Sequence, residues 1–211
     1  MIKNALLLGV ALAFAGSAQA MTTVSSTNGP DTGPLAGQTV MYDFESGTPA
    51  GLTGNFAIVQ GSVANQYAAP LDDTTHYLTV PIEGSAGSAT LALSSPLTSL
   101  SLYWGSIDTY NTISFADADG NSLGSFTGAQ IPPAPADGSQ GNALNNRRVN
   151  FDFGGSSAAS VTFTSGSKAF EVDNIAGAVP EPATWAMLIT GMGMVGAAAR
   201  RRRSSGIVVT A

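Results

Sequence analysis

The 211-residue sequence contains no cysteine and only one histidine, His76. Without cysteine the chain has no disulfide bonds, so its fold must rest on a packed core, with a bound metal as the other means of stabilisation. His76 has no partner histidine or cysteine, which makes a transition-metal site around it a poor interpretation. These absences leave hydrophobic packing and oxygen-ligand chemistry as the features to look for.

Basic residues are scarce in the central part of the chain. Between Met21 and Val179 only Arg147, Arg148 and Lys168 are basic, against thirteen acidic residues, which gives a net charge of about −10 for this part. Such a charge argues against binding nucleic acid or other anionic polymers by bulk electrostatics. It suits solubility outside a cell and an affinity for divalent cations.

Long amphipathic helical patterns are also missing between residues 38 and 178. Short runs of alternating apolar and Ser/Thr residues, bounded by Gly, Pro, Asn and Asp, predict an all-β domain over 38–178, a β-sandwich or jelly roll. Residues 128–146 form the longest predicted loop, and the polar segment 21–37 is predicted to be a flexible lead-in. The predicted strands are 39–45, 56–60, 77–80, 89–93, 97–104, 112–116, 122–127, 148–153, 160–164 and 169–175.

The N-terminus has the pattern of a secretory signal peptide. Lys3 is the only charged residue among the first twenty, and a short apolar run, Ala5 to Ala15, follows it. Ala18 and Ala20 place small residues at the −3 and −1 positions of a cleavage site. We therefore predict that residues 1–20 are removed after export through the inner membrane.

The C-terminal region has an uncharged segment over residues 183–199, followed by the arginines at 200–203. Seventeen uncharged residues are at the lower limit for a membrane-spanning helix. Trp185 stands where an interfacial aromatic residue would anchor one end, and the arginines are expected to stay in the cytoplasm. The pattern predicts a single C-terminal transmembrane helix with the bulk of the chain outside the cytoplasm.

The residues that precede this segment make its interpretation more specific. The heptapeptide at 180–186, Pro-Glu-Pro-Ala-Thr-Trp-Ala, followed by a Gly-rich apolar run and arginines, resembles the PEP-CTERM sorting signal in its PEPxxWA form. The resemblance covers 179–203, and the short tail 204–211 departs from the usual pattern. The matching residues are Pro180, Glu181, Pro182, Trp185, Arg200, Arg201, Arg202 and Arg203.

This resemblance carries expectations about sorting. It implies an exosortase as partner, an integral-membrane enzyme that cuts near the Pro-Glu-Pro motif. It also implies a Gram-negative bacterium that makes exopolysaccharide, a transient stay in the inner membrane, and a final location at the cell surface or outside the cell.

Two motif matches do not indicate an enzyme. A GxGxxG match at 191–196 lies inside the apolar segment and has no acidic residue after it, so it does not predict a dinucleotide site. A GxSxG match at Ser122 lies in a predicted hairpin whose turn is 117–121, and His76 comes earlier in the chain, not later. We therefore predict no catalytic residues and no enzymatic activity.

The exported domain also resembles jelly-roll domains found in many PEP-CTERM proteins. The similarity lies in Tyr42–Glu45 near its start, Phe170–Ile175 at its end and a central stretch, 102–111. In related carbohydrate-binding sandwiches the first and last strands lie side by side and share a structural calcium ion. The resemblance thus implies calcium ligands, which are hard-oxygen donors, with ordinary surface acids as the alternative. The candidate ligands are Asp43, Glu45 and Asp173, with Asn174 in addition.

Four residues are candidates for contact with a sugar. Because side chains alternate along a strand, Tyr103 and Trp104 face opposite ways, and Trp104 shares its face with Leu100 and Leu102. Trp104 is therefore predicted to lie in the core. The exposed set is then predicted to be Tyr103, Asp108, Tyr110 and Asn111. The alternative is that these aromatics complete a small core.

Three classes of function follow. The first is a non-catalytic surface or matrix protein associated with exopolysaccharide or biofilm. The second is a carbohydrate-binding module of the same fold. The third and most remote is a secreted glycoside hydrolase, which needs two carboxylates at a set separation. No such pair stands out in the sequence, and we favour the first class.

Overall fold

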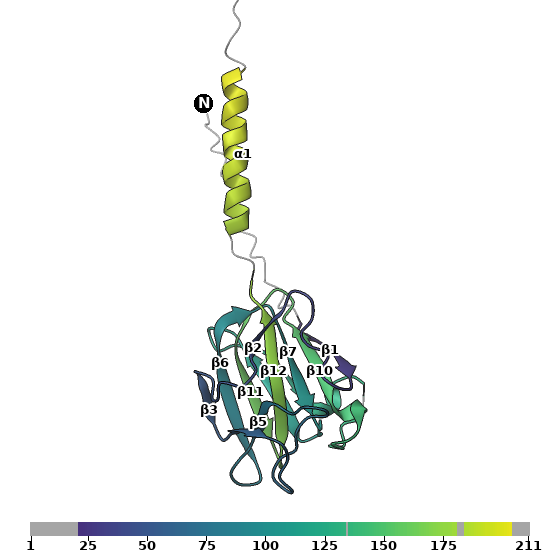
Figure 1. Cartoon of the computed structure of the whole chain (residues 1–211). Helices are drawn as coiled ribbons and strands as arrows, with labels where there is room; N and C mark the ends of the chain where they lie inside the picture. Colours follow the sequence, from purple (N-terminus) through teal and green to yellow (C-terminus); the bar gives the residue numbers. More distant parts are fainter. Residues whose placement is uncertain (1–20, 134, 181–183, 204–211) are drawn as a thin grey trace, which may run out of the picture.

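The structure, a computed structural model, describes residues 21–133, 135–180 and 184–203 (Figure 1). The predicted signal peptide, 1–20, and the short tail, 204–211, lie outside the described residues. Twelve strands, two short 3₁₀ helices and one α-helix make up the described chain. The strands are β1 (Thr23–Asn28), β2 (Thr39–Tyr42), β3 (Leu52–Gly54), β4 (Ala57–Gln60), β5 (His76–Val80), β6 (Gly87–Leu97), β7 (Ser99–Gly105), β8 (Asn111–Ala116), β9 (Ser122–Thr127), β10 (Arg147–Asp152), β11 (Ala158–Ser165) and β12 (Phe170–Ala178). The helices are η1 (Gly128–Gln130), η2 (Ala143–Asn145) and α1 (Thr184–Arg203).

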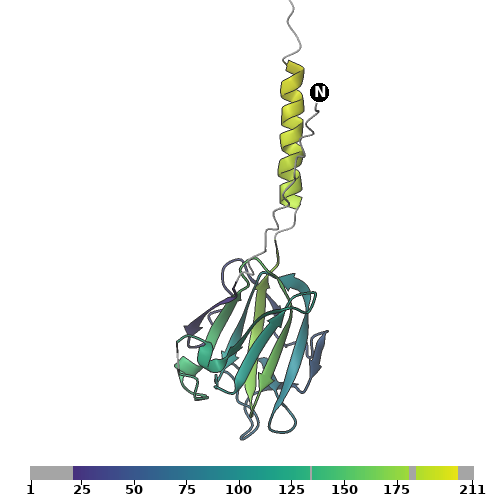
Figure 2. The same ribbon diagram turned by 180° about the vertical axis from the view of Figure 1, so that it is seen from behind.

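Two antiparallel sheets pack face to face as a β-sandwich (Figures 1 and 2). The seven-stranded sheet has the order β1-β10-β7-β12-β5-β4, and β2 also pairs with β12. The five-stranded sheet has the order β3-β6-β11-β8-β9. The predicted all-β sandwich is confirmed, and so is the pairing of a strand near the start of the domain, β2, with its last strand, β12.

The core lies between the sheets and follows from the alternation along the strands. Leu100, Leu102 and Trp104 of β7 are completely buried, as predicted for this face. Trp104 stacks on Phe170, with ring centroids 4.3 Å apart and planes at 19°. Phe163 of the facing sheet meets Phe170 edge-on at 5.5 Å. These aromatic contacts join the two sheets and stabilise the sandwich.

The outer face of the seven-stranded sheet is buried as well, which the sequence did not indicate. It carries polar and aromatic side chains, among them Tyr77, Ser101, Tyr103 and Arg148, each at most 2% exposed. Two loops, 29–38 and 61–75, cover this face. We call them the roof loops. The Tyr103 hydroxyl donates to the Leu71 carbonyl oxygen at 2.7 Å, and Gln38 Nε2 donates to Asn150 at 2.8 Å.

A close backbone contact fixes the second roof loop. Gly105 of β7 lies directly under Pro70, and a Cβ atom at position 105 would come within 2.8–2.9 Å of the proline ring and backbone. Such distances exclude any side chain there unless the loop moves away. Gly105 therefore allows the loop to lie against the strand.

The predicted flexible lead-in is wrong for its first half. Residues 23–28 form β1, an edge strand that pairs along its whole length with β10. The Thr22 side chain is buried and donates to the Leu123 carbonyl oxygen. The strand escaped detection because Val24 is its only apolar residue, so it lacks the apolar alternation from which strands are predicted.

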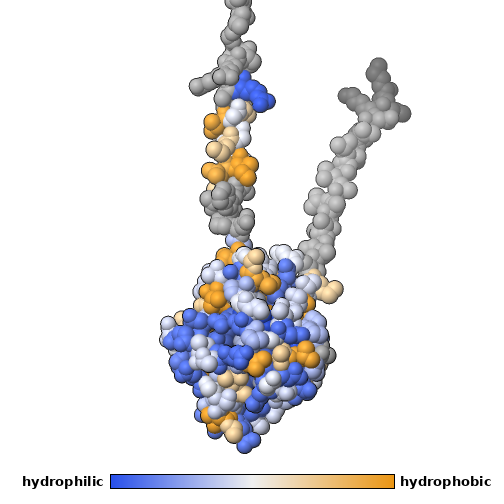
Figure 3. Space-filling model, turned by 45° about the vertical axis from the view of Figure 1, so that its right-hand side comes forward, coloured by the Kyte–Doolittle hydropathy of each residue, from blue (hydrophilic) through white to orange (hydrophobic). Residues whose placement is uncertain are grey.

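Helix α1 begins at Thr184 and ends at Arg203, over the region of the predicted apolar segment. Its large apolar residues, such as Met187 and Ile189, are mostly exposed. Figure 3 shows hydrophobic residues along the helix, whereas the visible face of the sandwich is mainly hydrophilic. Within the parts of the chain that the structure describes, no helix has the length and apolar character needed to cross a membrane. The position of α1 agrees with the predicted C-terminal helix.

Removing the central aromatic residue tests the role of the core. We expect Trp104→Ala to lower the free energy of unfolding by about 3–5 kcal/mol, because it leaves a large cavity against Phe170. Urea unfolding followed by circular dichroism measures this. Leu144→Ala is the control, since Leu144 is 41% exposed and its loss is expected to change stability by no more than about 0.5 kcal/mol. Similar losses for the two variants would contradict this assignment of the core.

Candidate functional site

A small polar cleft opens where β12 begins. Its volume is about 160 Å³. Four segments line it: 62–68 of the second roof loop, 106–110 between β7 and β8, 138–140 of the long loop, and 168–171 at the start of β12. Because these segments come from distant parts of the sequence, the cleft exists only in the folded sandwich. Its lining is rich in hydroxyl, amide and carboxyl groups, which are groups suited to binding a hydroxyl-rich ligand.

Glu171 is the most deeply buried acid of this cleft, at 2% exposure. Its Oε1 atom accepts a hydrogen bond from the Ala68 backbone N–H at 3.0 Å, and its Oε2 atom accepts one from the Ser106 hydroxyl at 2.8 Å. Burial raises the pKa of Glu171 to about 7, although these hydrogen bonds act in the opposite direction. The residue therefore ties the second roof loop to β12 and has both oxygen atoms engaged.

Asp108 and Tyr110 lie closer to the surface of the cleft. The Tyr110 hydroxyl donates to the Lys168 carbonyl oxygen at 3.1 Å and also interacts with the Asp108 carboxyl group. Burial raises the pKa of Asp108, and the neighbouring Tyr110 side chain opposes this shift. Gly138 packs on the carboxyl group with φ +69°, and a Cβ atom there would lie 2.4 Å from both carboxyl oxygens. Glycine at 138 thus lets the long loop close over Asp108.

The structure brings together two of the four predicted sugar-contacting residues, Asp108 and Tyr110. The expected exposure of the other two is wrong. Tyr103 is 1% exposed because the roof loops cover its face of the sheet. Asn111 is fully buried. Its Nδ2 atom donates to the Ala169 carbonyl oxygen at 3.2 Å, and its Oδ1 atom accepts from the Ser165 hydroxyl at 2.6 Å. Their roles are structural contacts within the fold.

Three further residues line the cleft that the sequence did not predict, Glu171, Ser106 and Lys168. The signal for Glu171 was present in the β12 sequence, Phe-Glu-Val-Asp-Asn-Ile, where acids alternate with apolar residues. Alternation places Glu171 and Asp173 on one face, opposite Phe170 and Val172. The remaining information, that a loop covers this face, was not in the local pattern.

The three predicted calcium ligands do not meet in one group. Asp43 is exposed, and its Oδ1 atom accepts from the Glu45 backbone N–H at 3.2 Å. Glu45 accepts from the His76 N–H at 2.6 Å and lies 3.1 Å from His76 Nδ1; the backbone hydrogen bond, followed by that from the ring, lowers the pKa of Glu45. Asp173 is buried under the second roof loop beside Thr75.

Across residues 21–133, 135–180 and 184–203 no cluster of three or more His, Cys, Asp or Glu is arranged to hold a metal ion. The predicted set of Asp43, Glu45 and Asp173 therefore does not fit a shared calcium ion as it stands, because Glu45 is engaged with His76.

The predicted sorting segment follows directly after β12. Pro180 is described, Glu181 and Pro182 lie outside the described residues, and Trp185 and the arginines at 200–203 belong to α1. Residues 178–203 match the PEP-CTERM protein-sorting motif. The chain carries a PEP-CTERM sorting signal. Such a signal implies export, membrane anchoring before exosortase cleavage, and delivery to the cell surface.

Other similarities of this chain to known proteins are distant. No curated protein matches it. The K2 cleaved adhesin domain of Lys-gingipain is 11% identical with a TM-score of 0.41, over 69% of this chain and 99% of that domain. The K3 cleaved adhesin domain of Lys-gingipain from Porphyromonas gingivalis is 11% identical with a TM-score of 0.36, over 66% of this chain and 97% of that domain.

The enzymatically active domain of tailspike protein 4 from bacteriophage CBA120 is also similar, with 18% identity and a TM-score of 0.36. The match covers 64% of this chain and only 20% of the tailspike domain. Likenesses this distant carry no argument about function.

The buried carboxyl group of Glu171 gives a test by pH. Its raised pKa means that the folded state keeps this proton at pH values where the unfolded state has lost it, so stability falls as pH rises from 4.5 to about 7. The full shift corresponds to about 3 kcal/mol. We expect the difference in unfolding free energy between the natural chain and Glu171→Gln to change by this amount between pH 4.5 and 7.5, in urea titrations. If this difference in unfolding free energy does not change with pH, Glu171 does not have a raised pKa in the folded state.

Proposed function

We propose that this chain is an exported, non-catalytic surface protein that an exosortase sorts and that associates with exopolysaccharide in a biofilm or extracellular matrix. The observation that supports sorting is the PEP-CTERM signal at 178–203. The acidic, hydrophilic sandwich suits an extracellular setting, and its core makes disulfides unnecessary. Polysaccharides made by the same cell are the partners that the resemblance implies.

The arrangement of the cleft supports the non-catalytic part of the proposal. A glycoside hydrolase needs one carboxyl group as acid and a second as base or nucleophile, both directed at the scissile bond. Here Glu171 is near Asp108, but both Glu171 oxygens already accept hydrogen bonds from Ala68 and Ser106. That bonding suits a structural carboxyl group better than a group that exchanges protons with a substrate.

The second candidate function is carbohydrate binding through the cleft. The observation in its favour is that Asp108 and Tyr110 stand together at the cleft with Gln140 and Lys168. Carboxyl, hydroxyl and amide groups recognise sugar hydroxyls by hydrogen bonding. The cleft volume of about 160 Å³ is small for a drug-sized ligand, so the cleft would take a single sugar ring or the end of a sugar chain. This function is compatible with the first and would supply its contact with polysaccharide.

Intact mass spectrometry of the mature protein tests the sorting. In cells with an active exosortase we expect a mature chain that lacks residues 1–20 and everything after a cut near Pro180–Pro182. In cells without the exosortase the chain should keep Arg203. The same mass in both cells, with Arg203 still attached, would overturn exosortase processing.

A polysaccharide pull-down tests the cleft. We expect Asp108→Asn together with Tyr110→Phe to weaken retention on exopolysaccharide from the same cells by about tenfold, since each loses a polar contact worth roughly 0.5–1.5 kcal/mol. Asp119→Asn, on the exposed 117–121 turn, is the matched control for charge. If the double variant is retained as well as the control, the cleft is not the binding site. Turnover of any glycan by the natural chain would contradict the non-catalytic assignment.

A further inference from the structure

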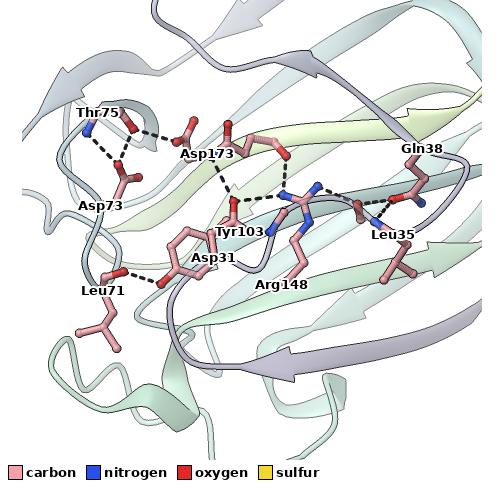
Figure 4. Close-up of polar contacts among 12 residues, drawn as sticks. Asp31, Leu35, Gln38, Leu71, Asp73, Thr75, Tyr103, Arg148 and Asp173 are labelled. Atoms are coloured by element: carbon pink, nitrogen blue, oxygen red, sulfur yellow. Dashed lines mark hydrogen bonds and ion pairs between the residues drawn. The ribbon is translucent and has the colours of Figure 1, made fainter.

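A second cleft, of about 200 Å³, lies under the second roof loop on the outer face of the sheet. Asp73 of the loop and Asp173 of β12 approach each other beside it, on either side of Thr75 (Figure 4). Asp173 is only 1% exposed, so its carboxyl group is removed from bulk water. This pair plays no part in the cleft around Glu171.

Near Thr75 there are more hydrogen-bond acceptors than donors. The Thr75 hydroxyl lies 2.5 Å from Asp73 Oδ1 and 3.2 Å from Asp173 Oδ2, but a hydroxyl carries one proton and can donate to only one of them. Asp73 Oδ2 and Asp173 Oδ1 are buried and have no hydrogen-bond partner. Asp173 is buried and Asp73 is half-buried, and buried carboxylate oxygens without a partner are costly unless a cation or a shared proton lies between them.

The neighbouring charges do not supply the missing partner. Asp31 and Asp72 line the same cleft and add negative charge. Arg148 is a cation on the same face of the sheet, but its terminal nitrogens donate to the Asp31 carboxylate, to the Asn174 carbonyl oxygen and to the Ser101 hydroxyl.

We propose that Asp73 and Asp173 bind a hard divalent cation of the calcium type, with the Thr75 hydroxyl as a further ligand. Calcium takes carboxylate, hydroxyl and carbonyl oxygens together with water, and so does not need a third acidic residue. The site shares Asp173 with the set that the sequence suggested but uses the roof loop in place of Asp43 and Glu45. Its consequence is that the cation fastens residues 71–75 to β12 and thereby stabilises the roof loop whose first half, 62–68, lines the Glu171 cleft.

Thermal unfolding of the full chain tests the site, first in EDTA and then with millimolar calcium chloride. A ligand that binds only the folded state raises Tm, by several degrees when it is in large excess over its dissociation constant. We expect this rise in the natural chain and its loss in Asp73→Asn and in Asp173→Asn. Asp43→Asn and Glu45→Gln are the matched controls and should respond to calcium as the natural chain does.

The Tm measured in EDTA shows whether each variant still folds. Asparagine has the shape of aspartate without its charge, so both variants should be at least as stable as the natural chain when no cation is present. Terbium, which replaces calcium at oxygen sites and is excited through nearby tyrosine, gives a second readout because Tyr103 lines the same cleft. Equal calcium responses in the natural chain and Asp173→Asn, or no response to either ion, would overturn the site. The result is independent of polysaccharide binding.

Discussion

The arrangement of the outer face of the seven-stranded sheet depends on the ion pair and hydrogen bonds of the buried Arg148 guanidinium group. Arg148 lies across from Tyr103 of β7, and Tyr103 lies across from Asp173 of β12, so a charged residue stands in the middle of a sheet face. A buried charge must be paired and hydrogen-bonded. Asp31 of the first roof loop supplies the ion pair at 3.4 Å, and the bulged Asn174 supplies a carbonyl oxygen at 2.7 Å. The need to satisfy Arg148 thus helps to explain why this loop lies on the sheet.

The roof loops in turn create both clefts. Residues 61–75 are fixed at Gly105 by a backbone contact with Pro70, and on either side of that contact they meet an acid of β12. Glu171 holds the Ala68 N–H, and Asp173 faces Thr75 and Asp73. Two acids that are two residues apart on one strand face therefore position one loop. Because this loop lines both clefts, we expect a ligand bound in either one to change the stability of the wall of the other.

The strands of the sandwich were largely predictable, and the site was not. The hairpin of β8 and β9 and the core position of Trp104 follow from alternation and turn residues, which are local properties of the sequence. Tyr103 and Asn111 were expected at the surface because alternation says only which way a side chain points. Whether that face meets water depends on loops distant in sequence. The edge strand β1 was missed for a related reason, since its pairing with β10 relies on backbone hydrogen bonds more than on apolar side chains.

The same distinction explains why the sorting signal was read correctly from the sequence alone. A receptor-read address is a short contiguous peptide, so the residues at 178–203 carry its information in their order. The proposed binding cleft has no such contiguous signal: Asp108 and Tyr110 come from the loop between β7 and β8 and Glu171 from β12, and only the fold brings them together. On the outer face of the seven-stranded sheet, the roof loops leave only the two clefts open. Glu171 and Asp173 therefore shape both clefts through the loop that they hold, whereas Tyr103 of β7 is covered by it.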